Sequence, residues 1–150
     1  MGYLQAFKLD KNAVLPNRNH STDAGADLFA LEDVFIPVGS TAKIRTGIAL
    51  KIENKYVGKI EGRSSMNAKG IITAGGVVDA GYSGELSVIL HNFSNREVSP
   101  NHTNLVGYQV KAGEKIAQIL VYQVDTPPVY EVRELWNSDR GSKGFGSSGR

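Results

Sequence analysis

The 150 residues suit a single domain with a buried core, and the formal net charge of +2 gives no broad electrostatic case for nucleic-acid or membrane binding. The chain has no cysteine, which excludes disulfides and thiolate metal sites, and its three histidines include no close pair. Because no apolar run approaches the length of a membrane span, the expected location is the cytoplasm.

Short runs rich in β-branched and aromatic residues predict strands along most of the chain. The expected strands are residues 3–9, 27–30, 42–52, 56–61, 71–73, 86–93 and 116–124. Their spacing indicates an all-β sandwich, jelly roll or barrel. The single expected helix is short, with Ser64 or Ser65 as N-cap and Gly70 as its end.

The segment around Asp79 and Tyr82 is the most informative part of the chain. The apolar runs 77–78 and 86–90 flank a stretch rich in Asp, Gly and Ser, which predicts a β-hairpin with both residues in its turn region. A carboxylate on a rigid turn beside an aromatic ring could act as a general base next to a flat ligand. Asp79 equally suits a turn-shaping role, with Tyr82 packed on a neighbouring strand.

Three further segments contain polar groups that each have two interpretations, one as part of a site and one as ordinary local structure. Arg63, Ser64 and Ser65 suit a phosphate, and the serines also suit helix capping. The carboxylate of Asp27 suits a site or a turn entering a strand. Gln118 interrupts an apolar strand, where it faces either a site or solvent.

Beyond residue 136 the composition changes to a glycine-rich stretch, which predicts a domain over residues 1–136 and a flexible C-terminal arm over 137–150. The arm contains one aromatic residue, Phe145, among glycines and cations. It is either a disordered terminus or an arm that orders over a ligand.

Together and in this order, five segments resemble the five motifs of the homotrimeric deoxyuridine triphosphatases (dUTPases). They are residues 24–28, 62–66, 76–86, 113–120 and 140–149, so the resemblance covers most of the chain. It implies a distorted β jelly roll that forms a homotrimer with three shared active sites. The C-terminal arm of one subunit would close over a site formed by the others.

The resemblance implies a dUTP diphosphatase that hydrolyses dUTP to dUMP and pyrophosphate with Mg²⁺, keeping uracil out of DNA and supplying dUMP for dTMP synthesis. Asp79 would activate the water that attacks the α-phosphorus, and Asp27 would reach the metal through water. Tyr82 would lie under the deoxyribose and exclude a 2′-hydroxyl. The backbone of the hairpin segment, at Gly76 and Val78, would read the uracil.

The remaining site residues implied by the resemblance bind the phosphates and cover the base. Arg63, Ser64 and Ser65 would hold the α- and β-phosphates, with a further contact from Gln118. In the arm, Arg140 would pair with the γ-phosphate and Phe145 would stack over uracil. The terminal phosphates would be wrapped by Gly146, Ser147 and Ser148.

Two alternatives and one insertion remain open. A dCTP deaminase would need an Arg and a Glu where this chain has Ala68 and Ile89, so deamination is disfavoured. A dUTP-responsive regulatory protein on the same fold would use residues 99–108, a segment longer than is usual in the family, as a protein-binding loop. A virus-encoded chain would act in the host cytoplasm.

Overall fold

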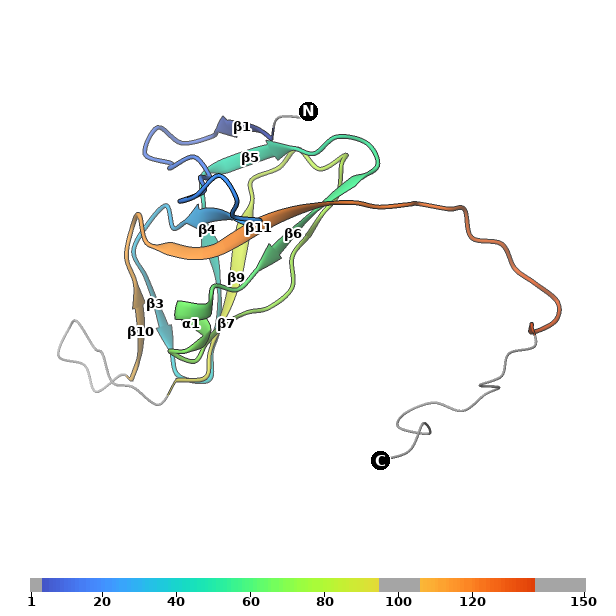
Figure 1. The fold of residues 1–150 in the computed structure, drawn as a ribbon. Coiled ribbons are helices and arrows are strands. Elements are labelled where there is room, and N and C mark those ends of the chain that lie inside the picture. The colour runs from blue at the N-terminus through green and yellow to red at the C-terminus, as the bar shows by residue number, and fades with distance from the viewer. Residues whose placement is uncertain (1–3, 95–105, 137–150) are drawn as a thin grey trace.

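The computed structural model describes residues 4–94 and 106–136, which form an all-β body with one short helix (Figure 1). The elements in chain order are β1 (Gln5–Lys8), β2 (Ala26–Phe29), β3 (Val34–Pro37), β4 (Thr41–Arg45), β5 (Ile48–Lys51), β6 (Tyr56–Glu61), α1 (Ser64–Asn67), β7 (Ile71–Thr73), β8 (Val77–Val78), β9 (Ser87–Asn92), β10 (Gly107–Val110) and β11 (Lys115–Gln123). The predicted all-β class with one short helix is confirmed.

Two larger sheets and two strand pairs enclose one core. The larger sheets have the orders β2-β11-β6-β8 and β4-β9-β7, and the pairs are β1-β5 and β3-β10. Alternate residues of β9 are buried, as expected for a strand with one face on a core. Leu28, Val88 and Ile119 are all at most 1% exposed and belong to one apolar cluster, so both larger sheets contribute to the same core.

The predicted strand over residues 42–52 is wrong, because the chain breaks at Thr46-Gly47 into β4 and β5. β4 pairs with β9, whereas β5 pairs with β1, so the break sends the chain into a different sheet. Gly47 has a φ of +69°, which a strand does not allow. The buried Thr46 hydroxyl donates a hydrogen bond to the Leu86 carbonyl (2.7 Å), which fixes the bend.

The predicted β-hairpin is also wrong, because its two strands lie in different sheets. β8 pairs with β6, and β9 pairs with β4 and β7. The connection between β8 and β9 therefore crosses from one sheet to the other. Asp79 and Tyr82 do lie in a turn of this connection, where the Tyr82 N–H donates to the Asp79 carbonyl (3.0 Å).

Strands β3 and β10 were not predicted, and they pair with each other. Gly107 lies opposite Pro37, and Tyr108 lies opposite Ile36. The end of the insertion predicted over residues 99–108 is therefore part of a sheet. Residues 99–105 lie outside the described residues, so their role as a protein-binding loop stays a prediction.

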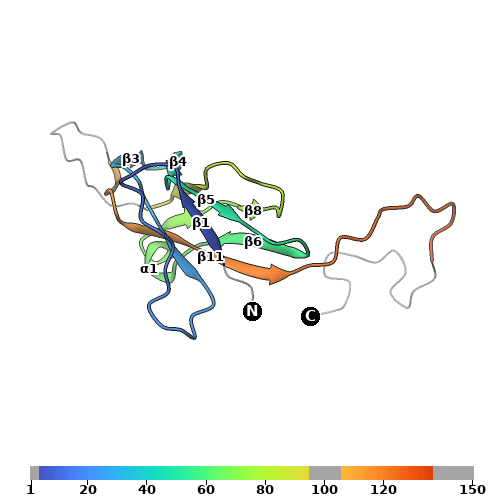
Figure 2. The same ribbon diagram turned by 90° about the horizontal axis from the view of Figure 1, so that it is seen from above.

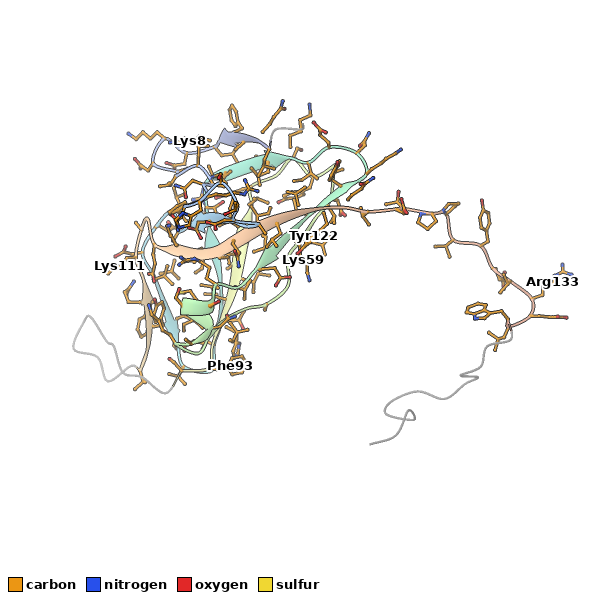
Figure 3. The ribbon with its side chains drawn as sticks, viewed as in Figure 1. Lys8, Lys59, Phe93, Lys111, Tyr122 and Arg133 are labelled. Atoms are coloured by element: carbon orange, nitrogen blue, oxygen red, sulfur yellow. The ribbon has the colours of Figure 1, made fainter. Side chains whose placement is uncertain are left out.

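The chain leaves the body after β11 (Figures 1 and 2). Every residue from 125 to 136 is exposed, including Val129, Leu135 and Trp136. Figure 3 shows Arg133 on this extended segment, far from Tyr122 on β11 and Lys59 on β6. The predicted boundary between residues 136 and 137 stays a prediction. No helix in the described ranges is both long and apolar enough to cross a membrane.

Replacing Gly47 with alanine should destabilise the fold more than the same change at Gly39. Both have positive φ, +69° and +74°, but only at Gly47 would a Cβ meet the Cβ of Ala13, at 2.8 Å. We expect Gly47→Ala to lower the free energy of unfolding by about 3 kcal/mol and Gly39→Ala by about 1 kcal/mol. Urea denaturation measures both, and equal losses would contradict the close packing at Gly47.

Candidate functional site

A hollow of about 520 Å³ lies where β2, β11 and the start of α1 meet. Strand register places Gln118 opposite Asp27 on one side and opposite Glu61 on the other. The structure therefore brings together the predicted site residues Asp27, Arg63, Ser64, Ser65 and Gln118, all of which line this hollow. We call it the phosphate-side hollow.

The carboxylate of Asp27 orients two cations at this hollow. One oxygen lies 3.0 Å from the Nε of Arg63, and the other lies 2.7 Å from the Nζ of Lys115. The side chain of Asp27 is only 12% exposed, so water screens these pairs little. Arg63 also donates to the Lys115 carbonyl (3.1 Å), and Lys115 donates to Asn19 (2.8 Å). Sequence reasoning missed Lys115 as a site residue, because its partner is distant in the chain.

The serine hydroxyls do not cap helix α1, contrary to the prediction. The N-cap is Arg63, with φ −92° and ψ 140°, and its side chain makes no capping hydrogen bond. Ser64 and Ser65 are exposed residues of the helix itself. The Oγ of Ser65 accepts a hydrogen bond from Arg63 (3.4 Å). Neither serine therefore caps the helix, and both line the phosphate-side hollow.

Gln118 fills the space between the segments that line the phosphate-side hollow. Its Nε2 donates to the Gly62 carbonyl (3.1 Å), which fixes the backbone just before Arg63. A Cβ at Gly25 would overlap the Oε1 of Gln118, so a larger residue there would push the Gln118 side chain aside. Gln118 thus faces the site rather than only solvent.

A second, smaller hollow of about 240 Å³ contains the predicted residues Gly76, Val78, Asp79 and Tyr82. We call it the Asp79 hollow. A Cβ at Gly76 would lie 2.6 Å from the Cβ of Ile60, so only glycine fits there. The other lining residues are Lys43, Ile60, Val77, Glu85, Leu86, Ser87 and Ile89. Sequence reasoning missed Lys43, since nothing in the local pattern of β4 connects it to Asp79.

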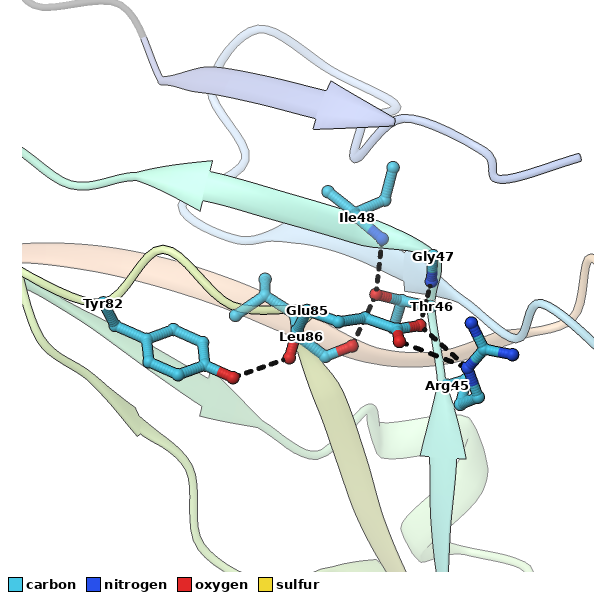
Figure 4. A network of polar contacts seen from close by, with 7 residues as sticks. All are labelled: Arg45, Thr46, Gly47, Ile48, Tyr82, Glu85 and Leu86. Atoms are coloured by element: carbon cyan, nitrogen blue, oxygen red, sulfur yellow. Dashed lines mark hydrogen bonds and ion pairs between the residues drawn. The ribbon is translucent and has the colours of Figure 1, made fainter. Parts of the chain in front are cut away.

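A hydrogen bond within its own loop holds the Tyr82 side chain. Its hydroxyl donates to the Glu85 carbonyl (2.9 Å), as Figure 4 shows. A Cβ at Gly84 would lie 2.6 Å from the Tyr82 hydroxyl oxygen, so the glycine leaves room for the ring. With 46% of its surface exposed, Tyr82 presents a fixed aromatic surface to the hollow.

Strand β6 separates the two hollows within one chain. Val78, next to Asp79, lies opposite Gly58 near the start of β6, whereas Arg63 follows the end of that strand. Five residues of strand span roughly 16 Å. Asp79 and Arg63 of one chain therefore line different hollows.

Tyr108 on β10 connects α1 and the residues after it to the turn before β11. Its hydroxyl is hydrogen-bonded to the Glu114 carboxylate, in the turn before Lys115, and accepts a hydrogen bond from Lys69 (3.3 Å). Its oxygen also lies 3.7 Å from the sulfur of Met66 in α1. Burial, followed by the hydrogen bond to Glu114, raises the pKa of Tyr108.

The raised pKa of Tyr108 predicts a pH-dependent stability. Because the folded pKa lies above that of the unfolded chain, this contribution is fully present below about pH 10 and is lost as pH rises toward the folded value. Tyr108→Phe removes the titration, so we expect its stability to fall less between about pH 8 and about pH 11. Urea denaturation at both pH values measures this, and identical losses in the two proteins would contradict it.

The remaining predicted site residues lie outside the described residues. They are Arg140, Phe145, Gly146, Ser147 and Ser148. Within residues 4–94 and 106–136, no group of three or more histidines and carboxylates is placed to hold a metal ion.

Comparisons with known proteins agree with the family resemblance that the five motifs indicate. A family model described as dUTPase matches residues 11–149. A deoxyuridine 5′-triphosphate nucleotidohydrolase of Clostridioides difficile is 36% identical over 149 residues, 97% of each chain. That of Paramecium bursaria Chlorella virus 1 is 37% identical over 150 residues, 99% of each chain.

Solved structures of phage dUTPases share the fold. The Staphylococcus bacteriophage 80alpha dUTPase with dUPNHPP has a TM-score of 0.89 at 35% identity and full coverage of both chains. A mutant dUTPase from phage phi11 of S. aureus, described as coordinating a structural Mg(II) ion, has a TM-score of 0.82 at 31% identity, over 89% of this chain and 98% of that one. The resemblance and the jelly-roll class are thus confirmed, and this chain belongs to the dUTPase family.

Proposed function

We propose that this chain is a dUTP diphosphatase, which hydrolyses dUTP to dUMP and pyrophosphate. Family membership supports this activity, as do nucleotidohydrolase relatives that match nearly the whole chain. The observation that carries it is the presence of two hollows with complementary chemistry. One offers a guanidinium and two hydroxyls, which suit phosphates, and the other offers a carboxylate beside an aromatic ring.

Asp79 is proposed as the general base. Its carboxylate takes a proton from the water as the water oxygen attacks the α-phosphorus, and the bond from that phosphorus to the bridging oxygen breaks to release pyrophosphate. The turn that bonds Tyr82 N–H to the Asp79 carbonyl supports this role, because it fixes the backbone that carries the base.

The Asp79 hollow is proposed to bind the nucleoside. Tyr82 lies under the deoxyribose and leaves no room for a 2′-hydroxyl, so UTP is rejected by shape and by an unpaired polar group. The backbone of Gly76 and Val78 pairs with the uracil edge. The absence of a side chain at Gly76 supports close approach of the backbone to the base.

The phosphate-side hollow is proposed to bind the α- and β-phosphates through Arg63, Ser64 and Ser65. The serine hydroxyls, neither of which caps helix α1, and the ion pair that orients Arg63 support this assignment. Gln118 contributes by fixing the Gly62 carbonyl, in addition to any contact with phosphate.

Mg²⁺ is the proposed cofactor. Because the described residues offer no cluster of three ligands, the donor set fits an ion held chiefly by phosphate oxygens, which Asp27 reaches through water. When bound, the ion would neutralise charge on the triphosphate. Both oxygens of Asp27 already face cations, so Asp27 also orients Arg63 and Lys115.

A homotrimer with shared sites is proposed, in which Asp79 of one subunit meets the phosphate-side hollow of another. The separation of the two hollows along β6 supports this arrangement. The exposed apolar residues after β11 support contact with a further subunit. The third subunit would supply the arm, residues 137–150, with Arg140 on the γ-phosphate and Phe145 over uracil. The terminal phosphates would be wrapped by Gly146, Ser147 and Ser148.

Deamination is less well supported than dUTP hydrolysis, and a regulatory role is a second candidate. Ile89 lines the Asp79 hollow and cannot move protons, which disfavours deamination. A dUTP-responsive regulatory role is a second candidate, because phage dUTPases with this fold are described as controlling transfer of virulence genes. Binding to nucleic acid or membrane is not expected. The cytoplasmic location and the partner role of residues 99–108 stay predictions.

The proposed activity predicts that Asp79→Asn binds dUTP but does not turn it over. Pyrophosphate release should occur with dUTP and Mg²⁺ but not with dCTP, dTTP or UTP. We expect Asp79→Asn to lower kcat by about a thousandfold, because the water loses its base. The affinity for the dUTP analogue dUPNHPP, the ligand of the phage 80alpha dUTPase structure, should change little.

Asp33→Asn is the matched control, since it neutralises an exposed carboxylate that lines neither hollow. Near-normal turnover by Asp79→Asn would reject Asp79 as the base. Absence of release from dUTP by the unaltered chain, with tight binding of dUTP, would favour the regulatory role.

A further inference from the structure

Glu85 connects the loop that carries Tyr82 to the bend between β4 and β5 (Figure 4). One of its carboxylate oxygens accepts a hydrogen bond from the Gly47 N–H (2.8 Å). Both oxygens lie 3.2 Å from the Nε of Arg45. The Glu85 side chain is 23% exposed and Arg45 is 48% exposed, so the carboxylate is the more buried partner.

The backbone next to Glu85 is fixed to the same bend. The Leu86 N–H donates to the Ile48 carbonyl (2.7 Å), and the Leu86 carbonyl accepts from the buried Thr46 hydroxyl (2.7 Å). The positive φ of Gly47 turns the chain at this bend. The Glu85 carbonyl and the Leu86 N–H belong to the same peptide unit. The hydrogen bond from Leu86 to Ile48 therefore also fixes the position of the Glu85 carbonyl.

This fixed carbonyl is the acceptor for the Tyr82 hydroxyl, at 2.9 Å. The position of the Tyr82 ring consequently depends on how firmly Glu85 is held. Rejection of UTP by shape requires that the Tyr82 ring stay in place, because a small displacement of the ring would admit the 2′-hydroxyl.

We propose that Glu85 is a positioning residue for sugar discrimination. Its carboxylate holds the loop end against Arg45 and Gly47, and this keeps the Tyr82 ring against the position of the 2′-carbon. The inference rests on the proposed function, because it requires Tyr82 to face the deoxyribose. Glu85 also lines the Asp79 hollow, but the proposed effect on the sugar acts through the Tyr82 ring and not through the Glu85 carboxylate.

Asp33 provides a matched control within the same chain. Its carboxylate also joins a cation to a backbone N–H, with 2.7 Å to the Nζ of Lys111 and 2.8 Å to the N of Ala112. It lines neither the Asp79 hollow nor the phosphate-side hollow. A purely structural role for Glu85 would make its neutralisation resemble that of Asp33.

The test measures kcat/KM for dUTP and for UTP, with melting temperature, in the full-length protein. We expect Glu85→Gln to lower the dUTP/UTP ratio by roughly fivefold to tenfold, the effect of losing one charge-assisted hydrogen bond, mainly through faster turnover of UTP. Asp33→Asn should leave the ratio unchanged. Tyr82→Phe should lower the ratio, and adding Glu85→Gln to it should lower it no further, since both act through the same ring.

Arg45→Gln is a milder variant that keeps the bond from Gly47 to Glu85, and it should lower the ratio less. This variant provides a second test of the inference if Glu85→Gln does not fold. An unchanged ratio in Glu85→Gln and Arg45→Gln, or additive effects with Tyr82→Phe, would overturn the inference alone. Failure of the unaltered chain to hydrolyse dUTP would overturn the proposed function and the inference with it.

Discussion

Strand β6 separates Asp79 from Arg63, the two groups that the proposed site brings together. It pairs with β8 near its start, which places Asp79 there, and it leads into Arg63 at its end. Backbone hydrogen bonds to β11 run along its whole length, so the strand cannot shorten this distance. This separation is the observation behind the proposed homotrimer, in which a second copy of the chain supplies the other half of each site.

The two halves are fixed by different interactions. In the phosphate-side hollow, the carboxylate of Asp27 orients Arg63 and Lys115, so the site depends on charge. In the Asp79 hollow, hydrogen bonds to the bend at Thr46-Gly47 hold the loop, so the site depends on backbone geometry. The first arrangement suits flexible, charged phosphates. The second suits a rigid base and sugar, for which small displacements matter most.

Local pattern was sufficient for two short runs that contain β-branched or aromatic residues and adjoin a glycine. The strands predicted over 56–61 and 71–73 match β6 and β7. The break at Gly47 was missed because residues on both sides of it suit strands, and only contacts with Ala13 and Leu86 show the bend. The hairpin prediction failed because a local pattern does not reveal which strand is the partner.

The candidate site residues were predicted mainly through the family motifs, and those within the described residues line two hollows. Lys115, Lys43 and Glu85 were not identified as site residues, because each is recognised only through partners far away in the sequence. The serines at α1 suited capping by local rules. The structure shows Arg63 at that position instead, with its side chain paired to Asp27.

Subunit mixing tests the central claim most directly, that Asp79 and Arg63 of different chains form each site. Asp79→Asn and Arg63→Ala proteins, each inactive alone, would be unfolded together, refolded and assayed for pyrophosphate release from dUTP. Random mixing in a cyclic trimer should restore about a quarter of the activity, because some interfaces then combine an intact Asp79 with an intact Arg63. No recovery in mixed trimers, verified with two different affinity tags, would contradict the shared site.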